Sequence, residues 1–182
     1  MKLPTERARG SAAHGTGPAS SQVSAADAGV LLLRLAVGLI LAGHGAQKLF
    51  GWFGGPGLGA TGKGFAELGY EPGVFFAGLT GVSELLGGLG LAVGLLTPLA
   101  AAAVIGVMIN AMAVAPEKSL WPAAGPAFVY PMLVAVGALT IAAVGPGRLS
   151  LDRAFPWWDG GWRPAGFALV VGVVAAVIVL AL

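Results

Sequence analysis

Five uninterrupted apolar stretches dominate this chain and limit what it can fold into. A helix that crosses a bilayer needs about 20 mostly apolar residues, and each stretch has 18 to 23. Strands of a membrane β-barrel would alternate in hydrophobicity over about 10 residues, which these stretches do not. Inside lipid the backbone polar groups must pair locally, so we expect helices. The stretches are residues 29–50, 73–95, 98–115, 126–145 and 164–182.

The composition agrees with a membrane protein and excludes several classes of site. Of the 182 residues, 57% are hydrophobic and only 10% charged, whereas soluble domains carry about 25% charged residues. No basic patch is interleaved with aromatic residues, so we expect no nucleic-acid partner. The chain has no cysteine, which rules out disulfides, thiolate metal sites, iron–sulfur clusters and c-type haem. We predict no metal site.

These patterns predict an all-α, polytopic membrane protein. The first four stretches lie within residues 28–153, and a tryptophan-rich interfacial linker and a fifth hydrophobic helix follow within 154–182. Residues 1–27 are small and polar, so we expect a disordered tail. The first apolar stretch is interrupted by Arg34 and has no cleavage site after it, so we interpret it as a retained span. The fifth helix either crosses the bilayer or lies against the others.

The lysines and arginines predict the orientation, because cytoplasmic loops carry an excess of them. With the N-terminus in the cytoplasm, six of these residues lie inside and three lie outside or at the outer rim. We therefore expect a multi-pass protein of the plasma membrane with a cytoplasmic N-terminus. The inner residues are Lys2, Arg7, Arg9, Arg148, Arg153 and Arg163, and the outer ones are Lys48, Lys63 and Lys118.

A small set of polar side chains interrupts the apolar stretches and forms a candidate polar centre. A charge at the bilayer centre costs about 2.5–3.5 kcal/mol on insertion scales, so such residues face the bundle, find partners and often mark function. Thr80 and Ser83 are also polar residues within the second apolar stretch. The candidate centre consists of Arg34, His44, Lys48, Glu84 and Asn110.

Helical geometry suggests how these residues meet. Arg34 and Lys48 are fourteen positions apart and share a face of their helix. Glu84 lies near the middle of the second stretch and could reach either basic partner. We expect an Arg34–Glu84 pair, with His44 and Lys48 toward the outer mouth and Asn110 joining by a hydrogen bond. Each of these residues also has an alternative, purely structural role. The Arg34–Glu84 pair could serve only to fix how the first two helices pack, and Lys48 could extend to the lipid headgroups. Asn110 could hold two helices together by a hydrogen bond.

The connection at residues 51–72 is long and rich in glycine. Its part "TGKGFAELGY" predicts a short interfacial helix capped by Thr61, with Phe65 and Leu68 toward lipid. The connection is either a flexible outer loop or a lid over the mouth near His44.

Three segments together resemble the DoxX family of bacterial integral membrane proteins. They are "LLLRLAVGLILAGHGAQKLFGWFGGPG", "GVSELLGGLGLAVGLLTPLAAAAVIGVMINAM" and "GPGRLSLDR", and the resemblance covers about residues 30–153. It implies a four-helix membrane bundle, with relatives linked to thiosulfate:quinone oxidoreduction or to membrane-associated oxidative-stress and thiol-redox assemblies. Arg34, His44, Lys48 and Glu84 occupy the family's polar motif positions, to which the resemblance attaches no catalytic role.

The first functional hypothesis is therefore a redox-associated membrane subunit, at most one part of an oxidoreductase complex. Quinone is its candidate ligand, with His44 exchanging a proton and Glu84 relaying it. Without cysteines, and with His14 and His44 as its two histidines, the chain offers no electron carrier of its own. A partner redox enzyme would have to supply the electrons.

Two alternatives stay open beside this hypothesis. The protein could be a scaffold that holds soluble redox or oxidative-stress enzymes at the membrane through residues 148–163, or a small transporter with Arg34, Glu84 and Asn110 along its pathway. Helix 98–115 is apolar all round and could face either the lipid or a second copy of the chain in a homo-oligomer.

Overall fold

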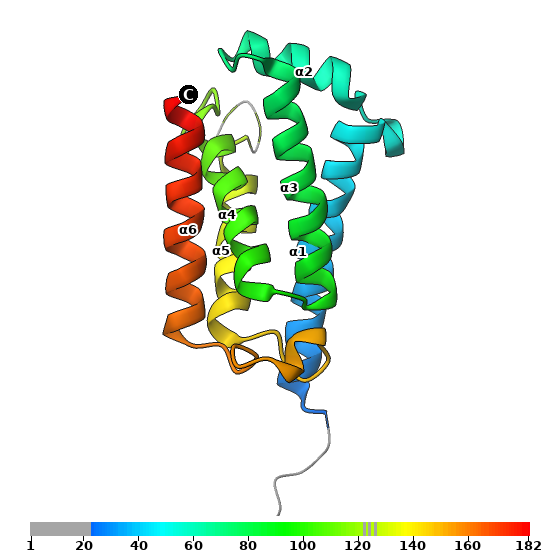
Figure 1. Cartoon of the computed structure of the whole chain (residues 1–182), viewed down its shortest axis with the longest axis vertical. Coiled ribbons are helices and arrows are strands. Elements are labelled where there is room, and N and C mark those ends of the chain that lie inside the picture. The colour runs from blue at the N-terminus through cyan, green and yellow to red at the C-terminus, as the bar shows by residue number, and fades with distance from the viewer. Residues whose placement is uncertain (1–22, 122, 124, 126) are drawn as a thin grey trace, which may run out of the picture.

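The computed structural model describes residues 23–121, 123, 125 and 127–182, and in this part the chain is all-α (Figure 1). Two short 3-10 turns, η1 (Trp52–Gly54) and η2 (Leu151–Ala154), accompany the helices. The helices are α1 (Ala25–Phe50), α2 (Gly57–Glu67), α3 (Gly73–Val93), α4 (Thr97–Ala113), α5 (Val129–Val144) and α6 (Trp162–Ala181).

The predicted all-α membrane fold is confirmed. Each of the five apolar stretches holds one helix, and α1, α3 and α6 are long and apolar enough to cross a bilayer. Helices α4 and α5 are equally apolar but have only 17 and 16 residues. These lengths lie at and just below the lower limit of about 17 residues for a spanning helix. Residues 1–22 of the predicted tail lie outside the described part, and α1 begins earlier than predicted, after the capping residue Ser24.

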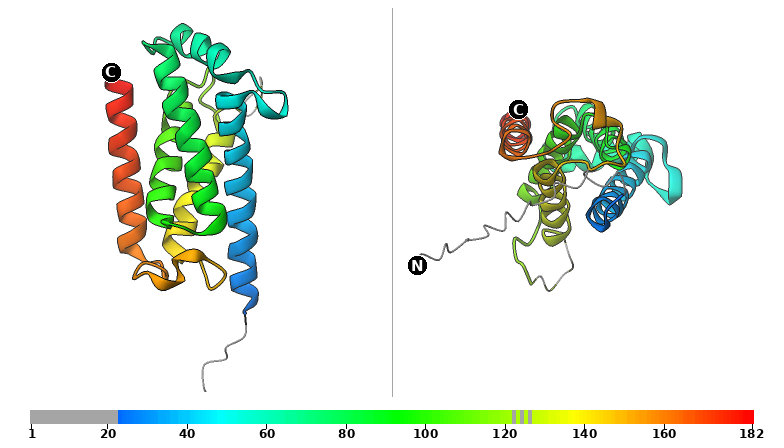
Figure 2. Two further views of the ribbon diagram at one scale, coloured as in Figure 1. Left: turned by 45° about the vertical axis from the view of Figure 1, so that its right-hand side comes forward. Right: turned by 90° about the horizontal axis from the view of Figure 1, so that it is seen from below.

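Five helices run along the long axis, and α2 crosses one end of the bundle (Figure 1). We call that end the α2 end. The opposite end, where α1 and α6 begin and the α3–α4 link and η2 lie, is the hairpin end. Helix α4 packs against α3, α5 and α6, while α1 packs mainly on α3. Helix α6 lies on the outside of the bundle beside α4 (Figure 2).

Glycines bring α1 and α3 into close contact. A Cβ atom on Gly38 would lie 2.5 Å from the carbonyl oxygen of Gly88, and the reverse substitution would be equally close. About two helical turns further along α1, a Cβ on Gly45 would lie 2.6 Å from the carbonyl oxygen of Gly81. Small residues allow helices to approach closely in a membrane, where packing replaces the hydrophobic effect. These two glycine pairs fix the register between α1 and α3.

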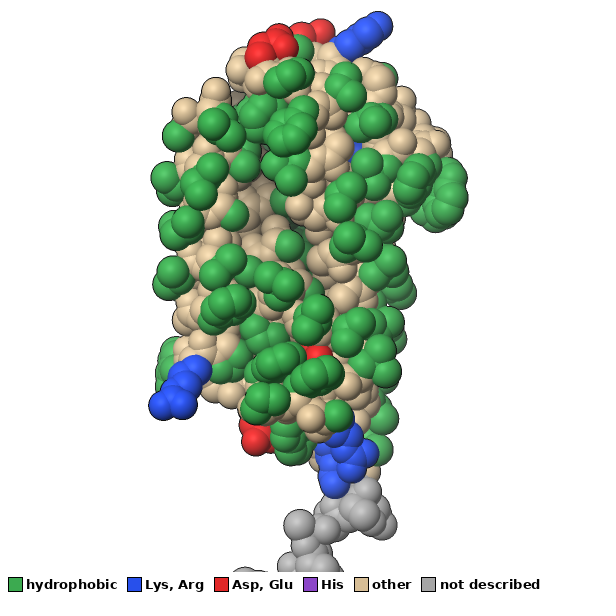
Figure 3. Space-filling view, in the orientation of Figure 1, with side chains coloured by type: hydrophobic (Ala, Val, Ile, Leu, Met, Phe, Trp, Pro, Cys, Tyr) green, Lys and Arg blue, Asp and Glu red, His purple; other side chains and the backbone are tan. Residues whose placement is uncertain are grey.

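Charged side chains gather at the two ends of the molecule on the face shown in Figure 3, and its middle band is mostly hydrophobic. This distribution suits a protein whose middle lies in hydrocarbon. The hairpin end carries Arg153 in η2 and Arg163 in α6, and the α2 end carries Lys63 in α2. Which end faces the cytoplasm stays a prediction from the lysine and arginine counts.

The absence of native cysteine makes the orientation directly testable. We expect a membrane-impermeant maleimide to label a Leu120→Cys variant in intact cells, because Leu120 lies in the α4–α5 connection at the predicted outer end. A Leu151→Cys variant should react only after the membrane is permeabilised. Both leucines are exposed and neither substitution changes a charge. The opposite labelling pattern would place the N-terminus outside.

Candidate functional site

The predicted polar centre is divided between the two ends of the bundle. Lys48, Glu84 and Asn110 line one cavity toward the α2 end, whereas Arg34 is bonded to groups at the hairpin end. His44 does not line the cavity. The expected Arg34–Glu84 pair is therefore wrong, and each of these two charges has a different partner.

Arg34 is held entirely by backbone carbonyl oxygens. It is 1% exposed. Its Nε donates to Leu91 at 2.9 Å and its Nη2 to Ala92 at 2.8 Å. Its Nη1 donates to Pro146 at 2.6 Å and Leu149 at 3.0 Å. The last carbonyls of a helix have no partner within that helix, and a guanidinium offers five N–H donors in a fixed fork. Arg34 thus closes the end of α3 and ties the segment after α5 to it.

The register of α1 and α3 explains why Arg34 does not reach Glu84. Gly38 lies beside Gly88, so a residue nearer the start of α1 falls beside the last turn of α3. Arg34 accordingly meets Leu91 and Ala92. Leu91 is seven residues after Glu84, about 10 Å along the helix axis. The acceptors within its reach are carbonyl groups at the end of α3 and after α5, and they satisfy the guanidinium without a carboxylate.

Asp152 is a buried acid that the sequence analysis missed. Its side chain is fully buried, and its two carboxylate oxygens accept from the N–H groups of Leu96 at 2.8 Å and Thr97 at 2.7 Å. It therefore caps the start of α4 in the way an N-cap residue would. A normal N-cap directly precedes its helix, but this acid lies 56 positions after Leu96. No local spacing could have revealed the contact.

Lys48 and Glu84 form an ion pair between the end of α1 and the middle of α3. Lys48 Nζ lies 2.6 Å from Glu84 Oε2, and the two side chains are 25% and 5% exposed. The close approach of α1 and α3 at Gly45 and Gly81 lets the lysine reach across. The alternative in which Lys48 extends freely to the headgroups does not hold, since its ammonium is bonded inside the bundle.

The ion pair lies on the wall of a cavity of about 260 Å³. Helices α3, α4 and α6 supply most of the lining, and α4 lies between α3 and α6 in Figures 1 and 2. In Figure 3 this face is hollowed in its upper half, between α6 and α3. The polar lining residues are Lys48, Tyr70, Thr80, Ser83, Glu84 and Asn110. The apolar ones are Phe65, Leu68, Leu79, Ala103, Val107, Ala111, Val114, Ala175, Ala176 and Val179, and Gly106 completes the lining.

Asn110 presents an acceptor without a partner at this cavity. Its Nδ2 donates to the carbonyl oxygen of Gly106 at 3.0 Å, one turn earlier in α4. Its Oδ1 is buried and has no hydrogen-bond partner among the described residues. A buried acceptor left unpaired costs about 1–3 kcal/mol. The expected hydrogen bond from Asn110 to the charged pair is absent, and the free Oδ1 can accept from a bound molecule.

His44 faces another neighbour. Its ring centroid lies 5.6 Å from that of Tyr130 on α5, and the residue is half-buried. His44 and Lys48 are one turn apart on α1, but His44 contacts Tyr130 on α5 and Lys48 contacts Glu84 on α3. The placement of His44 gives it no direct contact with the cavity.

The glycine-rich connection covers the α2 end of the cavity. The predicted helix exists, but it begins at Gly57, so Thr61 lies inside α2 and its hydroxyl donates to the carbonyl oxygen of Gly57 at 2.7 Å. Phe65 and Leu68, expected to face lipid, line the cavity instead. Tyr70 lines it as well, and burial raises the pKa of Tyr70 above its usual value. Its hydroxyl therefore stays a hydrogen-bond donor at neutral pH.

Among residues 23–121, 123, 125 and 127–182, no three acidic, histidine or cysteine side chains are placed to hold a metal ion. The polar groups at the cavity are an ammonium, a carboxylate, an amide and three hydroxyls. They can bind a small molecule that has both hydrogen-bond donors and acceptors, and they can exchange protons with it.

Comparison with known proteins gives two matches for this chain. The DoxX family model matches residues 29–117, a range that holds all five residues of the predicted centre. The uncharacterized membrane protein Rv3486 of Mycobacterium tuberculosis is 31% identical over 134 residues, which cover 68% of this chain and 79% of that protein. No solved structure matches.

We expect Arg34→Lys to destabilise the protein although it keeps the positive charge. A lysine ammonium has three donors on one nitrogen and cannot span carbonyls on two separate segments. Hydrogen bonds that involve a charged group contribute about 1.5–3 kcal/mol each, so the free energy of unfolding should fall by at least about that amount. Thermal or denaturant unfolding in detergent measures it.

The matched control is Arg153→Lys, because Arg153 is exposed at the same end of the bundle. Its stability should change by no more than about 0.5 kcal/mol. Equal stability of the two variants would mean that the four carbonyl contacts contribute little.

Proposed function

The chain belongs to the DoxX family and is a multi-pass membrane protein, and from that premise we propose that it is a redox-associated membrane subunit that binds a quinone ring in the Lys48–Glu84 cavity. One observation carries this proposal. A partly buried ion pair and an unpaired amide oxygen lie on the wall of one cavity within the bundle, where charges are costly.

The cavity size suits the ring of such a ligand. Its volume of about 260 Å³ is slightly below that of pockets for whole drug-sized ligands, which run from about 300 to 1,000 Å³. A headgroup would fill it, and an isoprenoid tail would have to leave it. Val107 and Val179 supply apolar walls on α4 and α6, along which such a tail could reach the lipid.

The polar groups suit both redox forms of a quinone. The ammonium of Lys48 can donate to a quinone carbonyl oxygen, and the free Oδ1 of Asn110 can accept from a quinol hydroxyl. Glu84, already bonded to Lys48 at 2.6 Å, can pass a proton to or from the ring. Reduction of a quinone to a quinol takes up two electrons and two protons, and the electrons would come from a partner redox protein.

The position of His44 changes one part of the earlier hypothesis. His44 lies beside Tyr130 rather than in the cavity, so the proposal gives direct proton exchange to Lys48 and Glu84. The scaffold and transporter alternatives stay predictions, since the described contacts favour neither of them over ligand binding.

We expect purified protein in phosphatidylcholine nanodiscs to bind short-chain ubiquinone-1 or menaquinone-2 saturably. Glu84→Gln removes the carboxylate while keeping the shape of the side chain, and a lost charge-assisted hydrogen bond of about 1.5–3 kcal/mol corresponds to roughly 10- to 100-fold weaker binding. Equilibrium dialysis with quantification of the quinone measures the dissociation constant.

Thr140→Val is the matched control, because it removes a polar group from a helix of the bundle, α5, away from the cavity. Ser83→Leu, which fills the cavity and leaves both charges in place, should also abolish saturable binding and guards against instability of the Glu84 variant. Saturable binding that persists in both Glu84→Gln and Ser83→Leu would rule out this site.

A further inference from the structure

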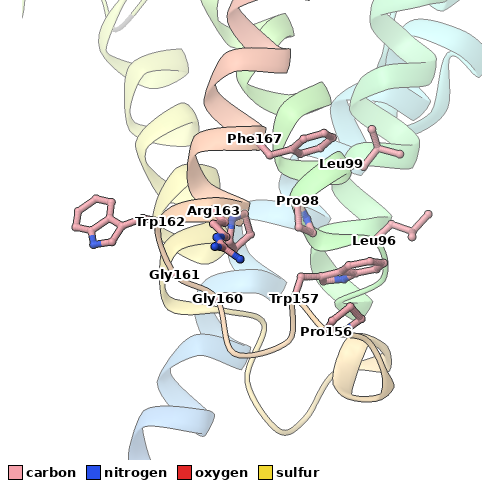
Figure 4. Close-up of a pocket in the computed structure, with 11 residues that line it drawn as sticks. Leu96, Pro98, Leu99, Pro156, Trp157, Gly160, Gly161, Trp162, Arg163 and Phe167 are labelled. Carbon is pink, nitrogen blue, oxygen red and sulfur yellow. The ribbon is translucent and has the colours of Figure 1, made fainter.

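A second, larger cavity opens at the hairpin end, away from the Lys48–Glu84 cavity. Its volume is about 800 Å³, within the range of about 300–1,000 Å³ for small-molecule sites. It lies between the start of α4, the start of α6 and the chain that leads into α6 (Figure 4). Its lining residues are Leu96, Pro98, Leu99, Pro156, Trp157, Gly160, Gly161, Trp162, Arg163, Pro164 and Phe167.

This second cavity is a groove on the surface of the bundle, and it has an apolar end and a charged end. In Figure 4, Phe167 and Leu99 lie further along α6 and α4, toward the middle of the bundle, whereas Arg163 and Trp157 lie nearer the hairpin end. Arg163 is exposed at the rim and makes no hydrogen bond or ion pair with any described residue. The direction from hydrocarbon to charge is the same as that of a phospholipid in the adjoining leaflet.

We propose that this groove binds an anionic phospholipid, with an acyl chain between Leu99 and Phe167 and the phosphate beside Arg163. The proposal is independent of the quinone site. It assigns a function to the α4–α6 surface, and residues 156–167 lie beyond the range that the family model matches.

The depth of the groove supports a lipid occupant. Tryptophans and arginines at the end of a membrane helix mark the headgroup level, and the segment that enters α6 carries Trp157, Trp162 and Arg163. Trp162 is 92% exposed, and its ring points away from the groove (Figure 4). Because α6 lies on the outside of the bundle, the groove is open to lipid from the side.

Two polar groups favour a lipid over a purely hydrocarbon occupant. The indole Nε1 of Trp157 is buried and has no acceptor among the described residues, and phosphate or ester oxygens could supply one after a small shift of the ring. Arg163 can give a phosphate two parallel N–H bonds. A lysine or arginine near the membrane surface contributes about 1 kcal/mol toward anionic lipids, equivalent to about a fivefold preference over zwitterionic ones.

Native mass spectrometry of the purified full-length protein tests this proposal, with equimolar phosphatidylglycerol and phosphatidylcholine as the probes. We expect the wild type to retain phosphatidylglycerol with about a fivefold preference. Arg163→Gln should abolish that preference. Arg153→Gln, which removes another exposed arginine from the same end, should leave it intact.

A second variant distinguishes lipid binding in the groove from non-specific attraction of anionic lipid to a basic surface. Leu99→Trp fills the groove but keeps every charge, so it should reduce retention of both lipids. Three results would overturn the proposal: a preference unchanged by Arg163→Gln, equal loss in Arg163→Gln and Arg153→Gln, or full lipid retention in Leu99→Trp. Unchanged unfolding temperatures would show that the variants are folded.

Discussion

A charged group at membrane depth needs a partner within the protein, and Arg34 shows how strongly this requirement shapes the bundle. Its guanidinium donates to four carbonyl oxygens from two segments. Those segments are the end of α3 and the chain after α5, and Asp152 adds a second link from the same chain to the start of α4. One arginine and one aspartate thus hold the end of α3, the start of α4 and the segment after α5 together at the hairpin end.

The charged side chains toward the α2 end are paired with one another instead of with backbone groups. This difference distinguishes a residue that stabilises the fold from residues that can bind a ligand. Arg34 is 1% exposed and bonded to backbone groups, so a ligand cannot reach it. Lys48 and Glu84 are bonded to one another beside open space, and the nearby Oδ1 of Asn110 is unpaired. A polar pair that borders a cavity can exchange partners with a bound molecule, which is why the proposed function is placed there.

The sequence predicted the helices well and the contacts between them only in part. Long apolar stretches identify membrane helices because lipid leaves the backbone no alternative. The cost of polar groups in hydrocarbon selected five residues for one predicted centre, of which the structure brings Lys48, Glu84 and Asn110 to one cavity but not Arg34 or His44. The partner of Glu84 was not predictable, because Arg34 and Lys48 share one face of α1 and the choice depends on the register with α3. That register rests on Gly38 and Gly88, whose pairing across two helices leaves no signal in local spacing. The contacts of Asp152 and the apolar cavity wall from α6 were missed for the same reason.

A double-mutant cycle on the free energy of unfolding tests most directly which basic residue Glu84 depends on. Residues in direct contact show coupling energies of about 0.5–3 kcal/mol, whereas distant ones add within about 0.3–0.5 kcal/mol. We expect Lys48→Met and Glu84→Gln to be coupled within that first range, and Arg34→Met and Glu84→Gln to be additive. Coupling of Glu84 to Arg34, with none to Lys48, would contradict the arrangement on which both the site and its proposed function rest.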